Sequence, residues 1–120
     1  MLPAPHRMRS TGEFSAVTRH GRRTRAGDVV VYLYPAGPAG ELPPGVTKVG
    51  LIVGRTVGGS VVRHQVSRRL RAQVATMLDR MPTGSHLVVR ALPSAATARS
   101  QTLARDLDTA IARLTSGPRR

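Results

Sequence analysis

We predict an α+β fold for this chain of 120 residues, a single-domain α/β sandwich in which helices pack on an open sheet in the order αβββαβα. Short runs rich in β-branched residues are typical of strands, and longer segments repeat apolar residues at the helical period. Helices and strands mixed along one short chain favour helices packed on a sheet. The residues place strands at 29–34, 49–53 and 86–90, and helices at about 11–19, 60–79 and 100–114; the remaining strand of this order is not placed.

The first helix begins at a capping box. Ser10 and Glu13 have the S-x-x-E spacing in which each side chain bonds the other residue's backbone amide. Phe14 and Val17 follow three residues apart and therefore share one helix face. On the residues alone, this pair indicates a core contact more strongly than a site. Gly21 is well placed to end the helix.

The first strand, 29–34, follows the basic run 22–25 and ends before Pro35. Residues 35–45 are rich in proline and glycine, which indicates a turn or surface loop. We therefore expect 29–34 and 49–53 to form an antiparallel pair across that loop.

The long helix follows a glycine-rich connection, and Ser60 can cap it. Its apolar stripe consists of Val62, Val66, Leu70, Val74, Met77 and Leu78. Pro82 and Gly84 then break the chain before the strand at 86–90. The last helix places four apolar side chains on one face: Leu103, Leu107, Ile111 and Leu114.

Charge and composition limit the classes of function that this chain can have. Nineteen Lys and Arg against six Asp and Glu give a net charge of +13, which attracts polyanions such as nucleic acid or an anionic membrane surface. With 40% apolar residues, the chain is too apolar for a disordered basic tail. No cysteine is present, so a disulfide framework, a zinc ribbon and a thiol nucleophile are excluded.

The N-terminus has no apolar secretory core, and the longest strongly apolar run, 29–34, is far shorter than a membrane span. Together with the absence of cysteine, these features lead us to expect a cytoplasmic protein without a membrane partner.

No catalytic constellation is evident. Asp106 and Asp108 lie two positions apart on a helix and diverge, and the other acids are scattered, so we expect no protein-held metal. The four histidines lack metal-ligand spacing. The segment 54–60 approaches a phosphate-binding P-loop but lacks its lysine, which argues against an NTPase.

The strongest feature is a cationic strip on the long helix. At about 100° per residue, Arg63, Ser67, Arg71, His64 and Arg68 fall within about 140° of one another, opposite the apolar stripe. No acid occurs between Glu41 and Asp79, so the strip lacks the alternating charges of an ordinary solvated surface. A phosphate-binding face is favoured. The glycine-rich turn before it either satisfies turn geometry alone or exposes amides to a phosphate.

These residues resemble a known family, the bacterial ribonuclease P protein subunit. Val49-Gly50-Leu51, followed by the run from Gly54 to Arg71, matches the spacing of the family motif Lys-Lys-Val-Gly-Asn-Ala-Val-x-Arg-Asn-Arg. Features around Glu13-Phe14, Arg19-His20-Gly21 and 87–90 also correspond, so the resemblance covers about 7–114. We take 1–120 as one such domain, with 116–120 as a basic tail.

The chain departs from the motif at several positions. It keeps Arg63, but His64 stands for Asn and Gln65 for Arg. The other differences are Gly59 for a common Asn, Ser67 for a common Lys and Thr18 for a second aromatic residue.

The resemblance implies a ribonucleoprotein that removes the 5′ leader from precursor tRNA, with catalysis by the RNA and its bound Mg²⁺. It also implies a left-handed βαβ crossover. The protein would bind ribonuclease P RNA through Arg55, Gly58, Gly59, Ser60, Arg63, His64, Gln65, Ser67, Arg68, Arg69 and Arg71. A cleft between the sheet and the first helix would hold the leader of precursor tRNA, with Phe14, Val17, Thr18, Arg22, Arg23 and Tyr32 as candidate lining.

Two other classes compete with this interpretation. A structural RNA-binding protein, such as a ribosomal protein, could have a similar fold and charge, but the spacing of Gly58-Gly59-Ser60-Val61-Val62-Arg63 favours the ribonuclease P subunit. A self-contained metal nuclease needs clustered carboxylates, which this sequence does not show.

Overall fold

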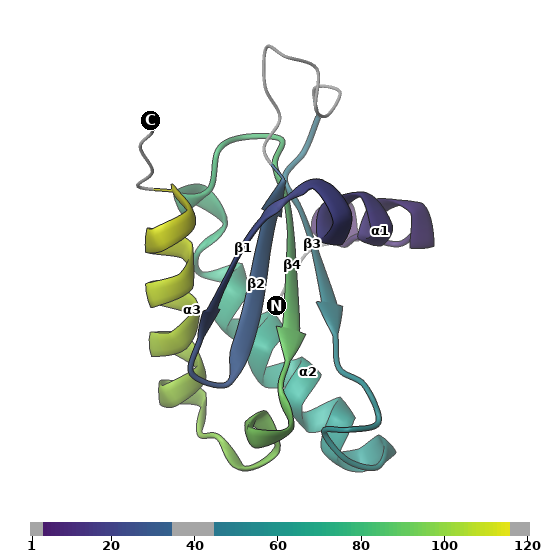
Figure 1. Cartoon of the computed structure of the whole chain (residues 1–120), viewed down its shortest axis with the longest axis vertical. Helices are drawn as coiled ribbons and strands as arrows, with labels where there is room; N and C mark the ends of the chain where they lie inside the picture. Colours follow the sequence, from purple (N-terminus) through teal and green to yellow (C-terminus); the bar gives the residue numbers. More distant parts are fainter. Residues whose placement is uncertain (1–3, 35–44, 116–120) are drawn as a thin grey trace.

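The fold is a four-stranded sheet between unequal helical layers, given by a computed structural model that describes residues 4–34 and 45–115 (Figure 1). The longer helices are α1 (Thr11–His20), α2 (Ser60–Ala75) and α3 (Ser100–Thr115). The strands are β1 (Arg22–Ala26), β2 (Val29–Tyr34), β3 (Lys48–Ile52) and β4 (His86–Ala91). Three short 3₁₀ turns are η1 (Ala4–His6), η2 (Leu78–Arg80) and η3 (Pro93–Thr97). The order αβββαβα and the α+β class are confirmed.

The strand order is β1-β2-β4-β3, so the expected antiparallel pair of 29–34 and 49–53 is wrong. β4 lies between them, antiparallel to β2 and parallel to β3. The physical reason is burial: Leu87, Val88 and Val89 of β4 are all fully buried, and a strand that is apolar on both faces belongs at the centre of a covered sheet.

The basic run 22–25 also forms a strand, β1, at one edge of the sheet. It joins β2 through a two-residue turn in which Gly27 has a φ of 55°, a backbone conformation that glycine adopts without strain. Arginine side chains on an edge strand discourage pairing with another chain.

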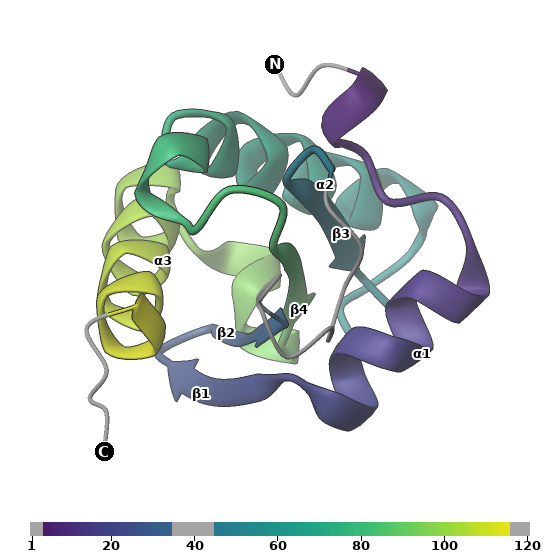
Figure 2. The same cartoon turned by 90° about the horizontal axis from the view of Figure 1, so that it is seen from above.

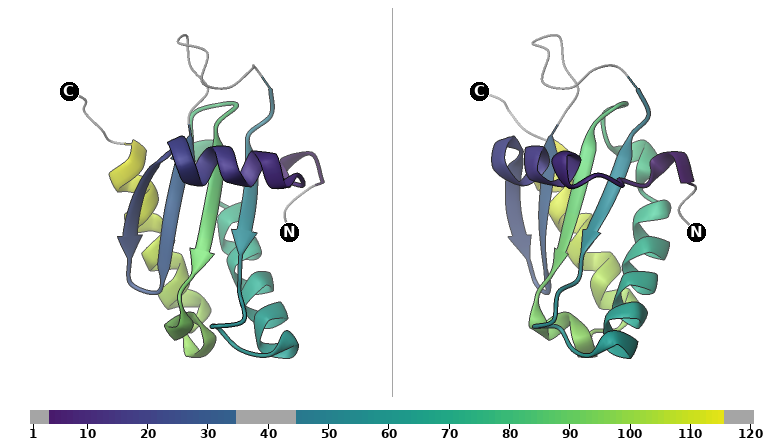
Figure 3. Two further views of the ribbon diagram at one scale, coloured as in Figure 1. Left: turned by 45° about the vertical axis from the view of Figure 1, so that its right-hand side comes forward. Right: turned by 90° about the vertical axis from the view of Figure 1, so that its right-hand side faces the viewer.

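Helix α2 lies on one face of the sheet beside α3, and α1 crosses the opposite face (Figures 2 and 3). Seen from the α2 side with the parallel strands β3 and β4 pointing up, β4 lies to the left of β3 (Figures 1 and 3). The β3-α2-β4 crossover is therefore left-handed, against the usual right-handed rule.

Two cores flank the sheet. The larger one joins the inner faces of α2 and α3 to one side of the strands, and it contains Val66, Leu70, Leu103, Leu107 and Ile111. The smaller one lies under α1 and contains Met8, Val17, Tyr32 and Val88. Alternate residues of β2 and β4 serve opposite cores, as the pleat requires.

The N-terminal cap of α1 is the one predicted from the sequence, whereas the cap of α2 is not. The capping box of Ser10 and Glu13 is present, and Gly21 ends α1. The cap of α2 is Gly59 instead of Ser60, which is the first helical residue, and no side chain caps this end. The helix stops at Ala75, because the chain then tightens into η2.

Candidate RNA-binding surface

The cationic strip of α2 is exposed to solvent along most of its length. His64, Gln65 and Arg68 are exposed, and Arg63, Ser67 and Arg71 are half-buried at its margins. The buried Val66 and Leu70 hold the opposite face against the sheet. The helix therefore presents its cationic face to solvent, as the angular spacing of these residues along the helix predicts.

Arg69 lies outside this strip. Its guanidinium Nη1 donates to the carbonyl of Ala98, at 3.4 Å, which ties α2 to the end of η3. Arg63 differs again, because its Nε is buried with no partner among the described residues. Arg69 therefore braces the fold and Arg63 is partly buried, while Arg68 is exposed and Arg71 is half-buried.

The turn before α2 is compact. Val57 is buried and its amide donates to the carbonyl of Gly54 at 3.0 Å, while Arg55 and Gly59 are exposed and Gly58 is half-buried. The first helical hydrogen bond runs from the Arg63 amide to the carbonyl of Gly59. Because no side chain caps this end, the early amides of α2 add positive potential beside Arg55.

A second surface lies where α1 crosses the sheet. Phe14 is half-buried, with its ring against Gly50 of β3. Val17 is fully buried, and Tyr32 is only 5% exposed, so both contribute to the small core more than to an open surface. Of the predicted cleft aromatics, Phe14 keeps the larger accessible face.

The arginines of the sheet divide between its two faces. Arg22 donates to the Leu114 carbonyl of α3 at 3.1 Å, on the side away from α1. Arg23 instead lines a hollow of about 360 Å³ on the α1 side, together with Arg25, Arg90 and Tyr32. The Thr18 hydroxyl donates to the carbonyl of Phe14, within α1.

Sequence reasoning missed Arg25 and Arg90. Both lie on strands, Arg25 two positions after Arg23 and Arg90 two positions after Val88. The alternation places Arg23 and Arg25 on one face, and the antiparallel register sets Arg25 opposite Val30 and Val30 opposite Arg90. The alternation could be found in the sequence, but only the strand order shows that the three arginines lie together.

The two surfaces meet at the β3 edge of the sheet, where the N-terminal segment at Arg7 and Met8 pairs with Val49. A hollow of about 190 Å³ there is lined by Phe14, by Ser67 and Arg71 of α2, by residues 49–51 of β3, and by Arg7 and Met8. The predicted cleft and the cationic strip are therefore continuous around one edge of the sheet.

An ion pair holds α1 against this edge. The Lys48 ammonium lies 2.8 Å from the Glu13 carboxylate, and its hydrogen bond, with those of the Arg9 and Ser10 amides, lowers the pKa of Glu13 to about 2. His86, the register partner of Lys48, has its pKa lowered chiefly by burial. At this edge, the positive charge of Lys48 is therefore balanced by the carboxylate of Glu13.

Within the described residues, no three His, Asp or Glu side chains gather where they could hold a metal ion. Asp106 accepts a hydrogen bond from the Asp28 amide, and Asp108 pairs with Arg80, so both serve the fold. Of the helices in 4–34 and 45–115, none is long and apolar enough to cross a membrane. Fold and surface together define a small basic α+β protein built to bind a polyanion.

Comparison with known proteins identifies the family. The sequence profile described as Ribonuclease P matches residues 2–115. The "Ribonuclease P protein component" of Corynebacterium diphtheriae is 44% identical over 95% of this chain and 97% of its own length. That of Streptomyces bikiniensis is 45% identical over 98% of both chains. The chain belongs to the ribonuclease P protein family.

Solved structures agree on the fold. The RNase P protein of Staphylococcus aureus superposes with a TM-score of 0.75 at 18% identity, covering 91% of this chain and 96% of that one. The RNase P protein of Thermotoga maritima, solved with 1-(4-fluorophenyl)-2-thiourea, gives 0.70 at 19% identity, covering 85% and 94%.

Proposed function

We propose that this chain is the protein subunit of a ribonuclease P ribonucleoprotein that removes the 5′ leader from precursor tRNA in the cytoplasm. The observation that carries the proposal is the continuity of two surfaces at the β3 edge, within a chain of this family. One is the arginine-rich face of α2, and the other is the cleft beside Phe14. A protein with two adjoining RNA-binding surfaces can hold a large RNA and a single-stranded substrate next to each other.

The α2 strip is the proposed contact for ribonuclease P RNA. Arg63, Arg68 and Arg71 would contact phosphates, and His64 and Gln65 would supply hydrogen bonds without a full charge. Arg55 and the uncapped amides at the start of α2 would hold a further phosphate.

The leader of precursor tRNA would cross the α1 side of the sheet. Phe14 offers a ring for a base to stack on, and Arg23, Arg25 and Arg90 surround the adjoining hollow. Single-stranded RNA is bound by this combination of stacking and positive charge.

The RNA would catalyse the cleavage. The described acids are scattered or engaged in the fold, so they do not fit a protein-held Mg²⁺ centre. We propose that Mg²⁺ is held mainly by the RNA, where it can activate water and stabilise the leaving oxygen. The protein would raise affinity and reduce the need for free Mg²⁺ by neutralising phosphates.

One assay tests this function against its rivals. Precursor tRNA is incubated with the protein alone, with the matching RNA alone at high Mg²⁺, and with both at low Mg²⁺. We expect cleavage in the second and third reactions only. Cleavage by the protein alone would support a metal nuclease, and no effect of the protein at low Mg²⁺ would favour a structural RNA-binding protein.

A further inference from the structure

Strand β1 is an edge strand, and within the described sheet it pairs with β2 alone. Its arginines on the α1 side, Arg23 and Arg25, line the hollow of about 360 Å³ that Arg90 of β4 also lines. We call it the arginine hollow. No acid is among the described residues that line it. Like charges gathered on one face of a sheet repel one another, so the strand that is easiest to displace carries two of three repelling charges.

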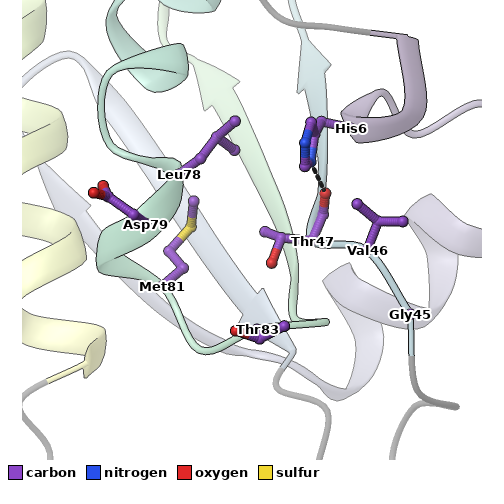
Figure 4. Close-up of a pocket in the computed structure, with 8 residues that line it drawn as sticks. All are labelled: His6, Gly45, Val46, Thr47, Leu78, Asp79, Met81 and Thr83. Atoms are coloured by element: carbon purple, nitrogen blue, oxygen red, sulfur yellow. Dashed lines mark hydrogen bonds between the residues drawn. The ribbon is translucent and has the colours of Figure 1, made fainter.

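A second hollow serves for comparison. It measures about 580 Å³ and lies between η2 and the start of β3, where Leu78, Met81 and Val46 make its walls largely apolar (Figure 4). Asp79 also lines it, and a carboxylate repels a phosphate. Of these two hollows, the arginine hollow is therefore the one that suits a phosphate of RNA.

Helix α3 holds β1 from the face of the sheet opposite to α1 (Figures 2 and 3). Arg22 of β1 donates to the carbonyl of Leu114, near the end of α3, at 3.1 Å. Arg113 of α3 makes the reverse contact. Its Nη1 donates to the carbonyl of Arg25 at 2.9 Å and to the hydroxyl of Thr24 at 3.5 Å. Each element thus binds a backbone carbonyl of the other through an arginine.

The turn after β1 is fixed by the same helix. Asp106, about two turns before Leu114, accepts a hydrogen bond from the Asp28 amide at 3.0 Å. Its carboxylate also fills the space that a Cβ on Gly27 would need. Asp106 to Leu114 rises about 12 Å along α3, and Arg22–Ala26 spans about 13 Å of strand. The contacts between α3 and β1 therefore match in spacing along the whole strand.

We propose that Arg113 is a positioning residue for leader binding: by holding the Arg25 carbonyl, it keeps the Arg23 and Arg25 guanidiniums at the arginine hollow, where they bind a leader phosphate. It acts through β1 and does not contact the RNA. Because its acceptor is a backbone carbonyl, the bond does not depend on the Arg25 side chain. The role rests on the proposed function, in which the leader crosses this face of the sheet.

The holoenzyme, reconstituted from the chain and its matching RNA, is assayed for binding of precursor tRNA and of mature tRNA. The ratio of the two affinities measures the contribution of the leader. Arg113→Met keeps the apolar stem without the donor and should lower this ratio by about threefold, the effect of one modest hydrogen bond, with binding of mature tRNA unchanged. Arg113→Lys keeps a charged donor and should recover most of the ratio.

The loss of charge needs its own control, because Arg113 is exposed. Arg105→Met removes the same charge from exposed surface of the same helix and should leave the affinity ratio unchanged. If Arg105→Met lowers the ratio as much as Arg113→Met does, net charge explains the effect and the proposal is overturned.

A double-mutant cycle tests whether Arg113 acts through the β1 arginines. The background Arg23→Ala/Arg25→Ala keeps Phe14 and also keeps the carbonyl of residue 25. In this background, Arg113→Met should still lower the midpoint of thermal unfolding, but it should have no further effect on the affinity ratio. A further loss in the ratio would mean that Arg113 contacts RNA itself or acts on the fold as a whole, and would overturn the proposal.

The parent holoenzyme separates this role from the function on which it rests. A parent that binds precursor and mature tRNA equally would contradict leader binding, and the role of Arg113 would fall with it. A parent that prefers precursor tRNA, with the same preference in Arg113→Met, would overturn the role of Arg113 alone.

Discussion

The ring of Phe14 lies directly against the backbone of Gly50, so closely that a Cβ on residue 50 would overlap the ring edge. Glycine is needed here for the approach of a neighbouring side chain, and not for an unusual φ. Because Phe14 is also the accessible aromatic of the proposed cleft, the position of a functional side chain depends on the absence of a side chain on β3.

Gly50→Ala should therefore displace the Phe14 ring. We expect a loss of about 1–3 kcal/mol in the free energy of unfolding, typical of an overpacked site, measured by denaturant titration. Leader binding should weaken as well. Gly54→Ala is the control, because a Cβ there meets no atom within 4 Å. Equal stability of Gly50→Ala and the parent would show that the ring moves aside freely.

Phe14→Ala should weaken binding of precursor tRNA and spare mature tRNA, which has no leader. Stacking of one base on an aromatic ring contributes about 1–3 kcal/mol, so the ratio of the two affinities should fall accordingly. Phe14→Leu preserves apolar packing on Gly50 and should recover stability without recovering the leader preference. A leader preference unchanged in both variants would place the leader elsewhere.

RNA binding should weaken steeply with salt. Each phosphate neutralised by an arginine releases counterions, so about five to eight contacts give a log–log slope of about −4 to −7. Filter binding or fluorescence anisotropy with the partner RNA over a salt series measures it. A slope near zero would exclude an electrostatic interface.

Gln65→Arg should tighten RNA binding and make the salt slope steeper by about one unit. Gln65 is exposed beside the strip, and helix propensity barely changes between the two residues. Arg63→Ala and Arg68→Ala should each make the slope shallower. Gln101→Arg adds the same charge on exposed α3 and serves as the control. If both glutamine variants behave alike, position 65 contacts no phosphate.

The Glu13–Lys48 pair predicts a specific pH dependence. The pKa of Glu13 is lowered to about 2 from its usual 4.5, so the fold favours the charged carboxylate. The resulting stability is present above about pH 4.5 and is lost as the pH falls toward 2. Glu13→Gln can keep the cap but not the ion pair.

The parent and Glu13→Gln are compared by thermal unfolding across this pH range. Their difference should be about 1 kcal/mol or less at neutral pH, because the pair is partly solvated, and it should vanish near pH 2. A constant difference at every pH would mean that the charge of Glu13 is irrelevant to the fold.

Local patterns predicted most elements of this fold, and long-range pairing explains the errors. The capping box at Ser10, the strand 29–34 and the apolar face of α3 depend on nearby residues, so they could be found in the sequence. The neighbour of β2 could not, because β4 is about fifty residues away and its pairing depends on burial of both faces. Val17 shows a related limit at the site: its spacing favours the core, the family resemblance implies the cleft, and the packed structure shows the side chain fully buried.

The central position of β4 has a consequence for synthesis of the chain. β2 and β3 have left the ribosome long before the strand that joins them, so the backbone N–H and C=O groups that pair with His86–Ala91 stay unpaired until then. Contacts of such sequence separation slow folding and leave edges open to wrong partners in the meantime. A nascent chain that stops before β4 should therefore be sensitive to protease and prone to aggregation, and one extended through α3 should resist both.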